Sequence, residues 1–185
     1  MGRDTVYLTT IDERGNSASF INSIYFPFGS TITAGSAGFL LQNRGYGFTL
    51  KEGHLNEYAP GKRPFHTLAP AMMLRDRDLH MSFGLMGGPI QPQVQLQMVL
   101  AILKYGLTIQ EAIDLPRCHF VSGNSVQFEP GIPGSTLAEL EAMGHHILPH
   151  TGANFGSAHA IQVDPETGTF FGACDPRTDG AALGY

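Results

Sequence analysis

The amino-acid sequence predicts an α+β fold, in which antiparallel strands form the sheets and helices cover them. Strand-like segments stand at both ends of the chain and helical segments lie between them, and such segregation favours antiparallel pairing. The 23 glycines gather in turns without a fixed period, which is typical of β-rich chains with tight loops. Hydrophobic residues make up 42% of the 185 positions, which is enough for the core of one domain.

The first predicted element is a hairpin at the front of the chain. Residues 4–11 alternate between two faces, with Val6 on one face and Tyr7 on the other, and we interpret them as a buried strand. Residues 12–16 supply a turn, because they include side chains that accept positive φ angles. Residues 17–26 then return as a second strand.

The segment after this hairpin is predicted to consist mainly of loops. Residues 28–38 have small side chains, and residues 49–64 are polar and rich in turn-forming residues. Long loops in compact domains are more often functional than not, so the second loop is of particular interest. Residues 71–74 and 80–84 follow as two strands joined by a charged turn.

The middle and the end of the chain predict helices followed by strands. A long helix is expected over residues 91–105, with Gly106 as its C-cap, and a short one over residues 109–114. The run Thr136-Leu137-Ala138-Glu139 fits a capping box that begins a helix ending at Gly144. Further strands are predicted over residues 125–129, 145–148, 158–164 and 169–174.

Charge, cysteine and histidine content exclude several classes of function. The net charge of −5 and the absence of a basic run argue against nucleic acid, and no apolar stretch is long enough for a membrane span. Cys118 and Cys174 are expected as free buried thiols, with one disulfide as the alternative. His145, His146 and His150 lack a carboxylate that would complete a ligand set, so we expect no metal site. No other cofactor is expected.

Thr5 is the first candidate for chemistry. An internal threonine is a poor nucleophile, but at a free N-terminus its own α-amine acts as the base. That role requires a cut between Asp4 and Thr5. The alternative is an ordinary strand residue, since threonine is common in strands.

Three other motifs are candidates for substrate contact or structural support. Gly87-Gly88 precedes the long helix, and its backbone N–H groups are candidates to bind a developing oxyanion. The alternative is a tight strand-to-helix turn. His66-Thr67 lies in a proline-stiffened stretch and is either a substrate contact or a loop anchor. We expect a structural role for Asp175-Pro176-Arg177.

Short stretches in order along almost the whole chain resemble the small, C-terminal catalytic subunit of the gamma-glutamyltranspeptidase family. The closer resemblance is to its gamma-glutamyltransferase-like and cephalosporin-acylase-like branch. The matching stretches are Asp4-Thr5-Val6-Tyr7-Leu8-Thr9, Asp12-Glu13-Arg14-Gly15-Asn16, Gly38-Phe39-Leu40-Leu41-Gln42-Asn43, Pro60-Gly61-Lys62-Arg63-Pro64, Met86-Gly87-Gly88, Asp114-Leu115-Pro116-Arg117, Gly172-Ala173-Cys174-Asp175-Pro176-Arg177 and Gly184-Tyr185.

The resemblance implies an N-terminal-nucleophile hydrolase, with an αββα sandwich of two antiparallel sheets between helix layers. Residues 1–185 would be a single catalytic segment, released when a precursor cuts itself before Thr5, and residues 1–4 a remnant of the preceding subunit or an artefact of expression. By the same resemblance, Ser23 contacts the nucleophile through its hydroxyl, Gly87 and Gly88 form the oxyanion hole, and no cofactor is needed.

Substrate recognition is where the sequence departs from the family. Tyr25, Arg44 and Gly47 stand where transpeptidases hold the substrate's α-amino group, and His66-Thr67 stands where they carry a serine pair for the α-carboxylate. Exchanging an aspartate for a glycine and gaining an arginine should disfavour an ammonium group and favour a carboxylate.

We therefore expect an amide hydrolase or acyltransferase that acts through an acyl-enzyme on γ-glutamyl or related acyl amides, such as glutathione-like or glutaryl substrates. The alternative is an inactive homologue, a binding or structural subunit in which Thr5 is never freed. The expected partners are a large subunit from the same precursor and a small-molecule amide or peptide, without nucleic acid or membrane, and higher oligomers are left open. The expected location is the cytoplasm, with the periplasm or secretion as alternatives.

Overall fold

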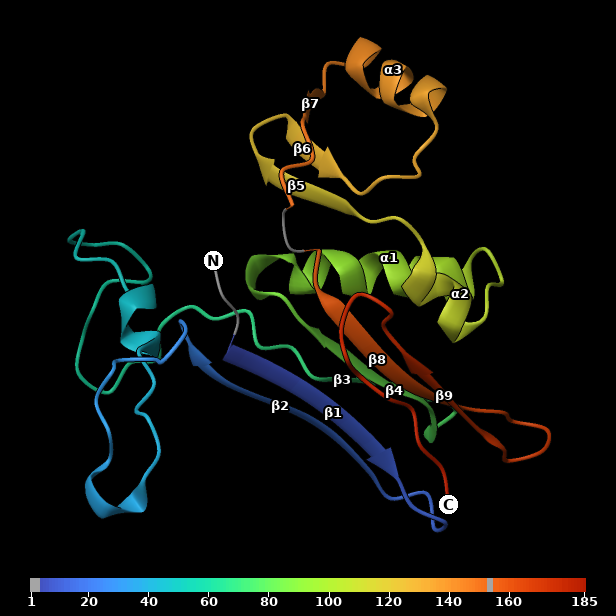
Figure 1. The fold of residues 1–185 in the computed structure, drawn as a ribbon, viewed down its shortest axis with the longest axis horizontal. Coiled ribbons are helices and arrows are strands. Elements are labelled where there is room, and N and C mark those ends of the chain that lie inside the picture. Colours follow the sequence, from blue (N-terminus) through green and yellow to red (C-terminus); the bar gives the residue numbers. More distant parts are fainter. Residues whose placement is uncertain (1–3, 153–154) are drawn as a thin grey trace.

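A computed structural model describes residues 4–152 and 155–185 of the chain (Figure 1). Two sheets are stacked on one another, and helices cover the far face of the larger sheet. The α+β class expected from the sequence is confirmed. Within the described residues, a helix layer and both sheets of the expected four-layer sandwich are present.

The front of the chain forms the predicted hairpin. Strand β1 (Asp4–Ile11) pairs antiparallel with β2 (Ser17–Tyr25). The predicted alternation holds, because Tyr7 is 6% exposed while Val6 and Leu8 are 56% and 46% exposed. The strand expected to be buried is thus buried on the Tyr7 face alone among the described residues, because none of them covers the face with Val6 and Leu8.

The larger sheet consists of antiparallel strands in the order β3-β4-β8-β9. Their bounds are Ala71–Arg75, Asp78–Met86, Ser157–Val163 and Phe170–Cys174. Alternate residues of β4 point to opposite faces of the larger sheet. Ser82 and Gly84 face β1. The residues that pack in the helix-covered core are Met81, Phe83 and Leu85. This alternation lets one strand join both layers of the sandwich.

Helices α1 (Gln91–Leu103) and α2 (Ile109–Asp114) cover the larger sheet. Val94, Met98 and Ile113 are at most 1% exposed in the resulting core. Helix α1 ends two residues before its predicted end, and Gly106 then takes a left-handed φ of 71°. The short helix α2 has its predicted bounds.

A smaller lobe holds β5 (Cys118–Ser122), β6 (Ser125–Phe128), β7 (His146–Leu148) and α3 (Gly134–Ala142) (Figure 1). Strand β5 was not predicted. Strand β7 pairs parallel to β6, contrary to the expected antiparallel pairing, because α3 carries the chain back to the same end of the sheet.

The predicted capping box at Thr136 and Glu139 is wrong. Helix α3 begins at Gly134, with Pro133 as its N-cap and without a side-chain cap. A capping box is formed instead at Thr108 and Glu111, where α2 begins.

A buried ion-pair network ties the end of the chain to the helices. Arg117 contacts Asp175 at 2.6 Å, with side chains 2% and 0% exposed, and Arg177 contacts both Asp175 and Glu129. The structural role expected for Asp175-Pro176-Arg177 is thus seen directly. Cys118 and Cys174 are free thiols, each half-buried rather than fully buried.

Candidate active site

Thr5 and Ser23 face one another across the hairpin. The two are register partners on β1 and β2, and the Thr5 hydroxyl donates a hydrogen bond to the Ser23 hydroxyl oxygen at 2.9 Å. Both side chains are half-buried. The geometry therefore brings a second hydroxyl to the candidate nucleophile.

A β-bulge lies at the peptide bond between Asp4 and Thr5. Asp4 pairs with Tyr25 but Thr5 pairs with Ser23, which leaves Ile24 as the extra residue on β2. Tyr25 takes a φ of 80°, which costs a tyrosine about 1–3 kcal/mol. Bulges and strained residues gather at functional sites, where they aim a side chain or interrupt pairing.

Arg44 brings a positive charge to this cluster. It begins the short 3-10 helix η2 (Arg44–Gly47), and its Nη2 donates to Ser23 Oγ at 2.8 Å. Its guanidinium carbon lies 4.7 Å from the centre of the Tyr25 ring, in cation–π geometry. Burial lowers the pKa of Arg44, and the Tyr25 hydroxyl acts in the opposite direction. An arginine nevertheless stays protonated in proteins, so the charge beside Thr5 is permanent.

The stacking of the two sheets carries Thr5 toward Gly87 and Gly88. The Thr9 hydroxyl meets the Ser82 hydroxyl at 2.6 Å, and the Tyr7 ring lies against Gly84. The two strands therefore run in opposite directions across the sandwich, so that the earlier residues of β1 lie over the later residues of β4, which lead into Gly87. Figure 1 shows the front of β1 and the loop into α1 at the same end of the sandwich.

Gly87 and Gly88 form the turn between β4 and the 3-10 helix η3 (Gly88–Ile90), which leads into α1. Their φ angles are 148° and 66°, which favour glycine. A Cβ on Gly87 would lie 2.8 Å from Ile90 and 2.9 Å from the Gly156 backbone, so side chains are excluded there. Both glycines precede α1, at the positive end of its dipole.

The segment with His66 and Thr67 is fixed to the beginning of α1. When the amide of the buried Gln91 is oriented with its nitrogen toward the neighbouring acceptors, it donates to the Thr67 carbonyl oxygen at 2.7 Å and to the Leu85 carbonyl oxygen at 3.2 Å. Thr67 is half-buried, whereas His66 is exposed. No contact of either side chain with Thr5, Ser23 or Arg44 is seen in the described part of the chain.

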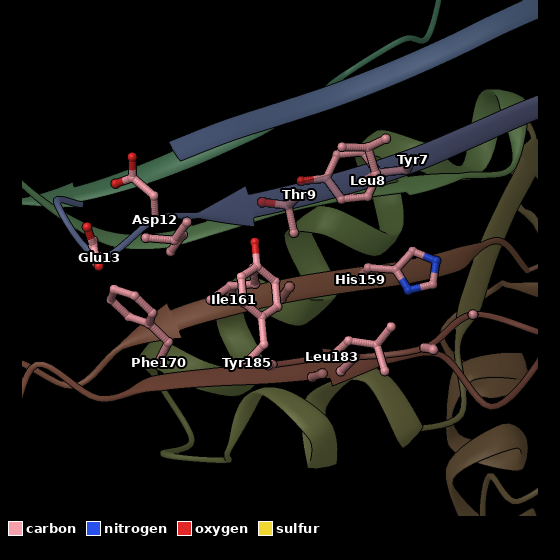
Figure 2. A pocket seen from close by; sticks show the side chains of 18 residues that line it. Tyr7, Leu8, Thr9, Asp12, Glu13, His159, Ile161, Phe170, Leu183 and Tyr185 are labelled. Carbon is pink, nitrogen blue, oxygen red and sulfur yellow. The ribbon is translucent and has the colours of Figure 1, made fainter. Parts of the chain in front are cut away.

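A cavity of about 710 Å³ lies elsewhere on β1 (Figure 2). Tyr7 and His159 line it from opposite strands, with ring centres 6.3 Å apart, and Leu183 and Tyr185 of the C-terminal tail close one side. Burial lowers the pKa of His159, and the Asp175 carboxylate opposes this shift. Thr5, Ser23 and Arg44 do not line this cavity, so it is separate from the threonine cluster.

Residues 4–152 and 155–185 contain no group of three histidine, cysteine, aspartate or glutamate side chains placed to hold a metal ion. In the same part of the chain, no helix is both long and apolar enough to cross a membrane.

The sequence pointed to Thr5, Ser23 and the glycine pair as site candidates. It did not predict the cation–π contact between Arg44 and Tyr25. The structure brings Thr5, Ser23, Tyr25 and Arg44 together, with Gly87 and Gly88 at the same end of the sandwich. It does not bring His66 into contact with them. The charge of Arg44 was visible in the sequence, but the bulge and the left-handed Tyr25 were not. The prediction that residues 1–4 are a remnant of the preceding subunit or an artefact of expression concerns mainly residues 1–3, which lie outside the described residues.

Comparison with known proteins identifies the family. The family model for gamma-glutamyltranspeptidase matches residues 1–185. The chain is 42% identical over 193 residues to the glutathione hydrolase-like YwrD proenzyme of Bacillus subtilis, covering 100% of this chain and 36% of that protein. It is 39% identical over 189 residues to the oxamate amidohydrolase proenzyme of Klebsiella pneumoniae, covering 98% of this chain and 36% of that protein.

Among solved structures, cephalosporin acylase from Bacillus halodurans is similar throughout. The TM-score is 0.89 and the identity 39%, over 97% of this chain and 34% of that chain. The chain thus spans about a third of the length of these relatives. Its fold is that of the corresponding part of an N-terminal-nucleophile hydrolase. Because the family model covers its whole length, the chain belongs to the gamma-glutamyltranspeptidase family.

Proposed function

We propose that the protein containing this chain is an N-terminal-threonine amide hydrolase or acyltransferase, with Thr5 as its nucleophile. The observation that carries the proposal is the Thr5–Ser23 hydroxyl pair at a β-bulge, 2.9 Å apart and beside a permanent cation. Cleavage between Asp4 and Thr5 frees the α-amine that serves as the base. Membership of a family whose relatives are named as proenzymes supports this processing step.

The proposed reaction proceeds through an acyl-enzyme. The Thr5 hydroxyl oxygen forms a bond to the substrate carbonyl carbon, and its proton passes to the Thr5 α-amine. Gly87 and Gly88 N–H groups stabilise the negative carbonyl oxygen of the tetrahedral intermediate. The C–N bond then breaks and the amine leaves with the proton. Water, or an acceptor amine, attacks the ester and restores the Thr5 hydroxyl.

Arg44 is proposed to bind the acyl half of the substrate. Its positive charge stands beside the nucleophile, so the acyl group that fits best carries a carboxylate. The relative from Klebsiella pneumoniae is named for oxamate, an amide that bears a carboxylate, and its similarity to this chain is consistent with that choice. Tyr25, His66 and Thr67 are proposed to complete the substrate-binding surface.

A large subunit from the same precursor is the proposed partner. Val6, Leu8 and Phe20 are 56%, 46% and 51% exposed on the outer face of the hairpin, and no described residue covers them. An apolar face of this kind favours a protein partner. The single catalytic segment, residues 1–185, would then be the smaller part of a two-subunit fold.

Amide hydrolysis by the full-length protein tests this proposal. Thr5→Ala should abolish hydrolysis of γ-glutamyl and dicarboxylic acid amides, because the nucleophile is lost. Thr10→Ala is the matched control, since Thr10 lies exposed on the same strand and should leave the rate unchanged. Full activity in Thr5→Ala would refute the assignment. If the unsubstituted protein itself stays uncut and inactive, the chain is instead a binding or structural subunit.

A further inference from the structure

The turn with Gly87 packs on a second glycine, Gly156, which directly precedes β8. A Cβ on Gly87 would lie 2.9 Å from the Gly156 Cα and 3.4 Å from its backbone nitrogen. The two backbones are therefore in contact, with no room for a side chain between them. A Cβ on Gly88, in contrast, would meet no described heavy atom within 4 Å. Of the two candidates for the oxyanion hole, Gly87 is thus the one that packs on Gly156.

Gly156 also lies against the peptide group that includes the Gly87 N–H. A Cβ on Gly156 would lie 3.0 Å from the Met86 carbonyl oxygen, which is closer than an ordinary van der Waals contact. Because a peptide bond is planar, the Met86 carbonyl and the Gly87 N–H turn as one unit. An atom that pushes on the Met86 oxygen therefore changes the direction of the Gly87 N–H. Gly156 leaves this peptide plane undisturbed, and its φ of 83° also favours glycine.

A buried ion pair holds the backbone around Gly156. Arg117 Nη1 donates to the carbonyl oxygens of Phe155 and Gly156, at 2.9 Å each. Arg117 Nη2 donates to Asp175 Oδ2 at 2.6 Å, and the same carboxylate oxygen accepts from the Ala158 N–H at 2.8 Å. The two charged side chains are 2% and 0% exposed. Both partners thus make charge-assisted hydrogen bonds to the backbone that flanks Gly156, and such bonds fix its geometry.

We propose that Gly156 is a positioning residue for the oxyanion hole, because its contact with Met86 aims the Gly87 N–H at the reacting carbonyl oxygen. Arg117 and Asp175 fix Gly156 for that purpose. The inference rests on the proposed function, since it needs Gly87 as an oxyanion donor. The carbonyl oxygen becomes fully negative only as the nucleophile attacks, so this alignment should matter for the transition state more than for substrate binding.

Gly156→Ala in the full-length protein tests this role. The added methyl group crowds the Met86 carbonyl, and a misplacement of about 1 Å at a reacting centre costs on the order of 100-fold in rate. For γ-glutamyl anilide and glutaramate we expect kcat to fall at least about tenfold, with KM within about threefold of the parent value. Rates would be divided by the amount of cut chain, measured by intact mass. A parent-like kcat in the cut variant would overturn the proposal, as would a loss that lies mainly in KM.

Gly168→Ala is the matched control. Gly168 has a φ of 71°, close to that of Gly156, but a Cβ there would meet no described heavy atom within 4 Å. It lies in the turn between β8 and β9, at the opposite end of β8 from Gly156. Both substitutions strain the backbone, and only Gly156→Ala crowds Met86. Gly168→Ala should keep the parent's kcat and KM. An equal loss of kcat in the two variants would assign the effect to strain and overturn the proposal.

Arg117→Lys tests the support of Gly156 without adding a methyl group. Lysine keeps a positive charge beside Asp175, but its single ammonium group cannot replace both ends of the guanidinium. We expect kcat to fall at least about threefold with KM unchanged, and a parent-like kcat would contradict the role of Arg117. For a variant that stays uncut, the large subunit would be coexpressed with a chain in which an initiator methionine directly precedes Thr5. The cell's aminopeptidase then frees Thr5, and the same kcat ratios are expected.

The proposed function and this inference fail in different ways. Loss of hydrolysis in Thr5→Ala together with a parent-like kcat in Gly156→Ala keeps the nucleophile and overturns the positioning role. An unsubstituted protein that stays uncut and hydrolyses neither amide would overturn both.

Discussion

Ser23 Oγ accepts hydrogen bonds from the Thr5 hydroxyl at 2.9 Å and from Arg44 Nη2 at 2.8 Å, so a single oxygen links the candidate nucleophile to the cation beside it. The backbone N–H of Tyr25 also donates to it, at 3.1 Å. Two nitrogen donors thus fix the Ser23 oxygen, and a fixed hydroxyl holds the Thr5 side chain in one rotamer. This arrangement makes Ser23 a positioning residue for the proposed reaction.

Replacing Ser23 should therefore affect the rate more than the stability. Ser23→Ala should lower kcat by about 10–100-fold, because Thr5 loses the hydroxyl that orients it. Ser23→Thr keeps the oxygen and should restore most of the rate. Measured kcat and KM for both variants, with the melting temperature as a check on folding, decide the matter. A Ser23→Ala enzyme with normal kcat would exclude the positioning role.

Because the Tyr7 ring packs closely on Gly84, a side chain at position 84 should destabilise the protein. A Cβ on Gly84 would fall within 2.8 Å of three Tyr7 ring atoms, and the Tyr7 side chain is buried between the sheets. We expect Gly84→Ala to destabilise the protein by about 1–3 kcal/mol, as overpacking does. Gly134→Ala is the control, because nothing lies within 4 Å of its Cβ position. Urea unfolding of both variants checks this, and equal midpoints would contradict the tight contact.

The buried Asp175 should make stability depend on acid pH. Burial raises the pKa of Asp175, but Arg117 and two backbone N–H groups outweigh it and the pKa lies below its ordinary value. A carboxyl group with a depressed folded-state pKa stabilises the protein above its unfolded pKa of about 3.9 and ceases to do so as the pH falls through the folded value. Stability should therefore decline as the pH is lowered below about 4.

Asp175→Asn tests that dependence. At pH 7 it should cost about 3–5 kcal/mol, because Arg117 is left buried without its partner. Below the folded pKa of Asp175 the difference between the variant and the parent should shrink. Asp179→Asn, at an exposed position nearby, is the control. A constant difference between the variant and the parent at all pH values would argue against the linkage.

Local patterns predicted the elements that depend on local chemistry. The front hairpin, α2 and the β8–β9 hairpin were predicted because alternation, helix ends and turn residues specify them. The same kind of motif failed at Thr136–Glu139, because Pro133 has a φ of −56° and the helix begins directly after it. The parallel β6–β7 pair depends on where α3 returns the chain, which no local pattern encodes.

The candidate site, too, was predictable from the sequence only in part. The family resemblance located Thr5, Ser23, Gly87 and Gly88, and the charge of Arg44 already indicated a preference for a carboxylate. The contact of Arg44 with Tyr25 depends on the bulge at Ile24 and on the positive φ of Tyr25, which pairing between strands sets. The shared contact of Arg44 and Thr5 with the Ser23 oxygen required coordinates.

The intact mass of the full-length protein tests the central claim most directly. We expect two polypeptides, the smaller of which begins at Thr5, and a Thr5→Ala variant that stays as one chain. An added mass on the Thr5-containing chain after treatment with an amide-mimicking electrophile would complete the assignment. A single uncut chain that hydrolyses amides as fast as any processed form would contradict the account, because Thr5 would then lack its α-amine base.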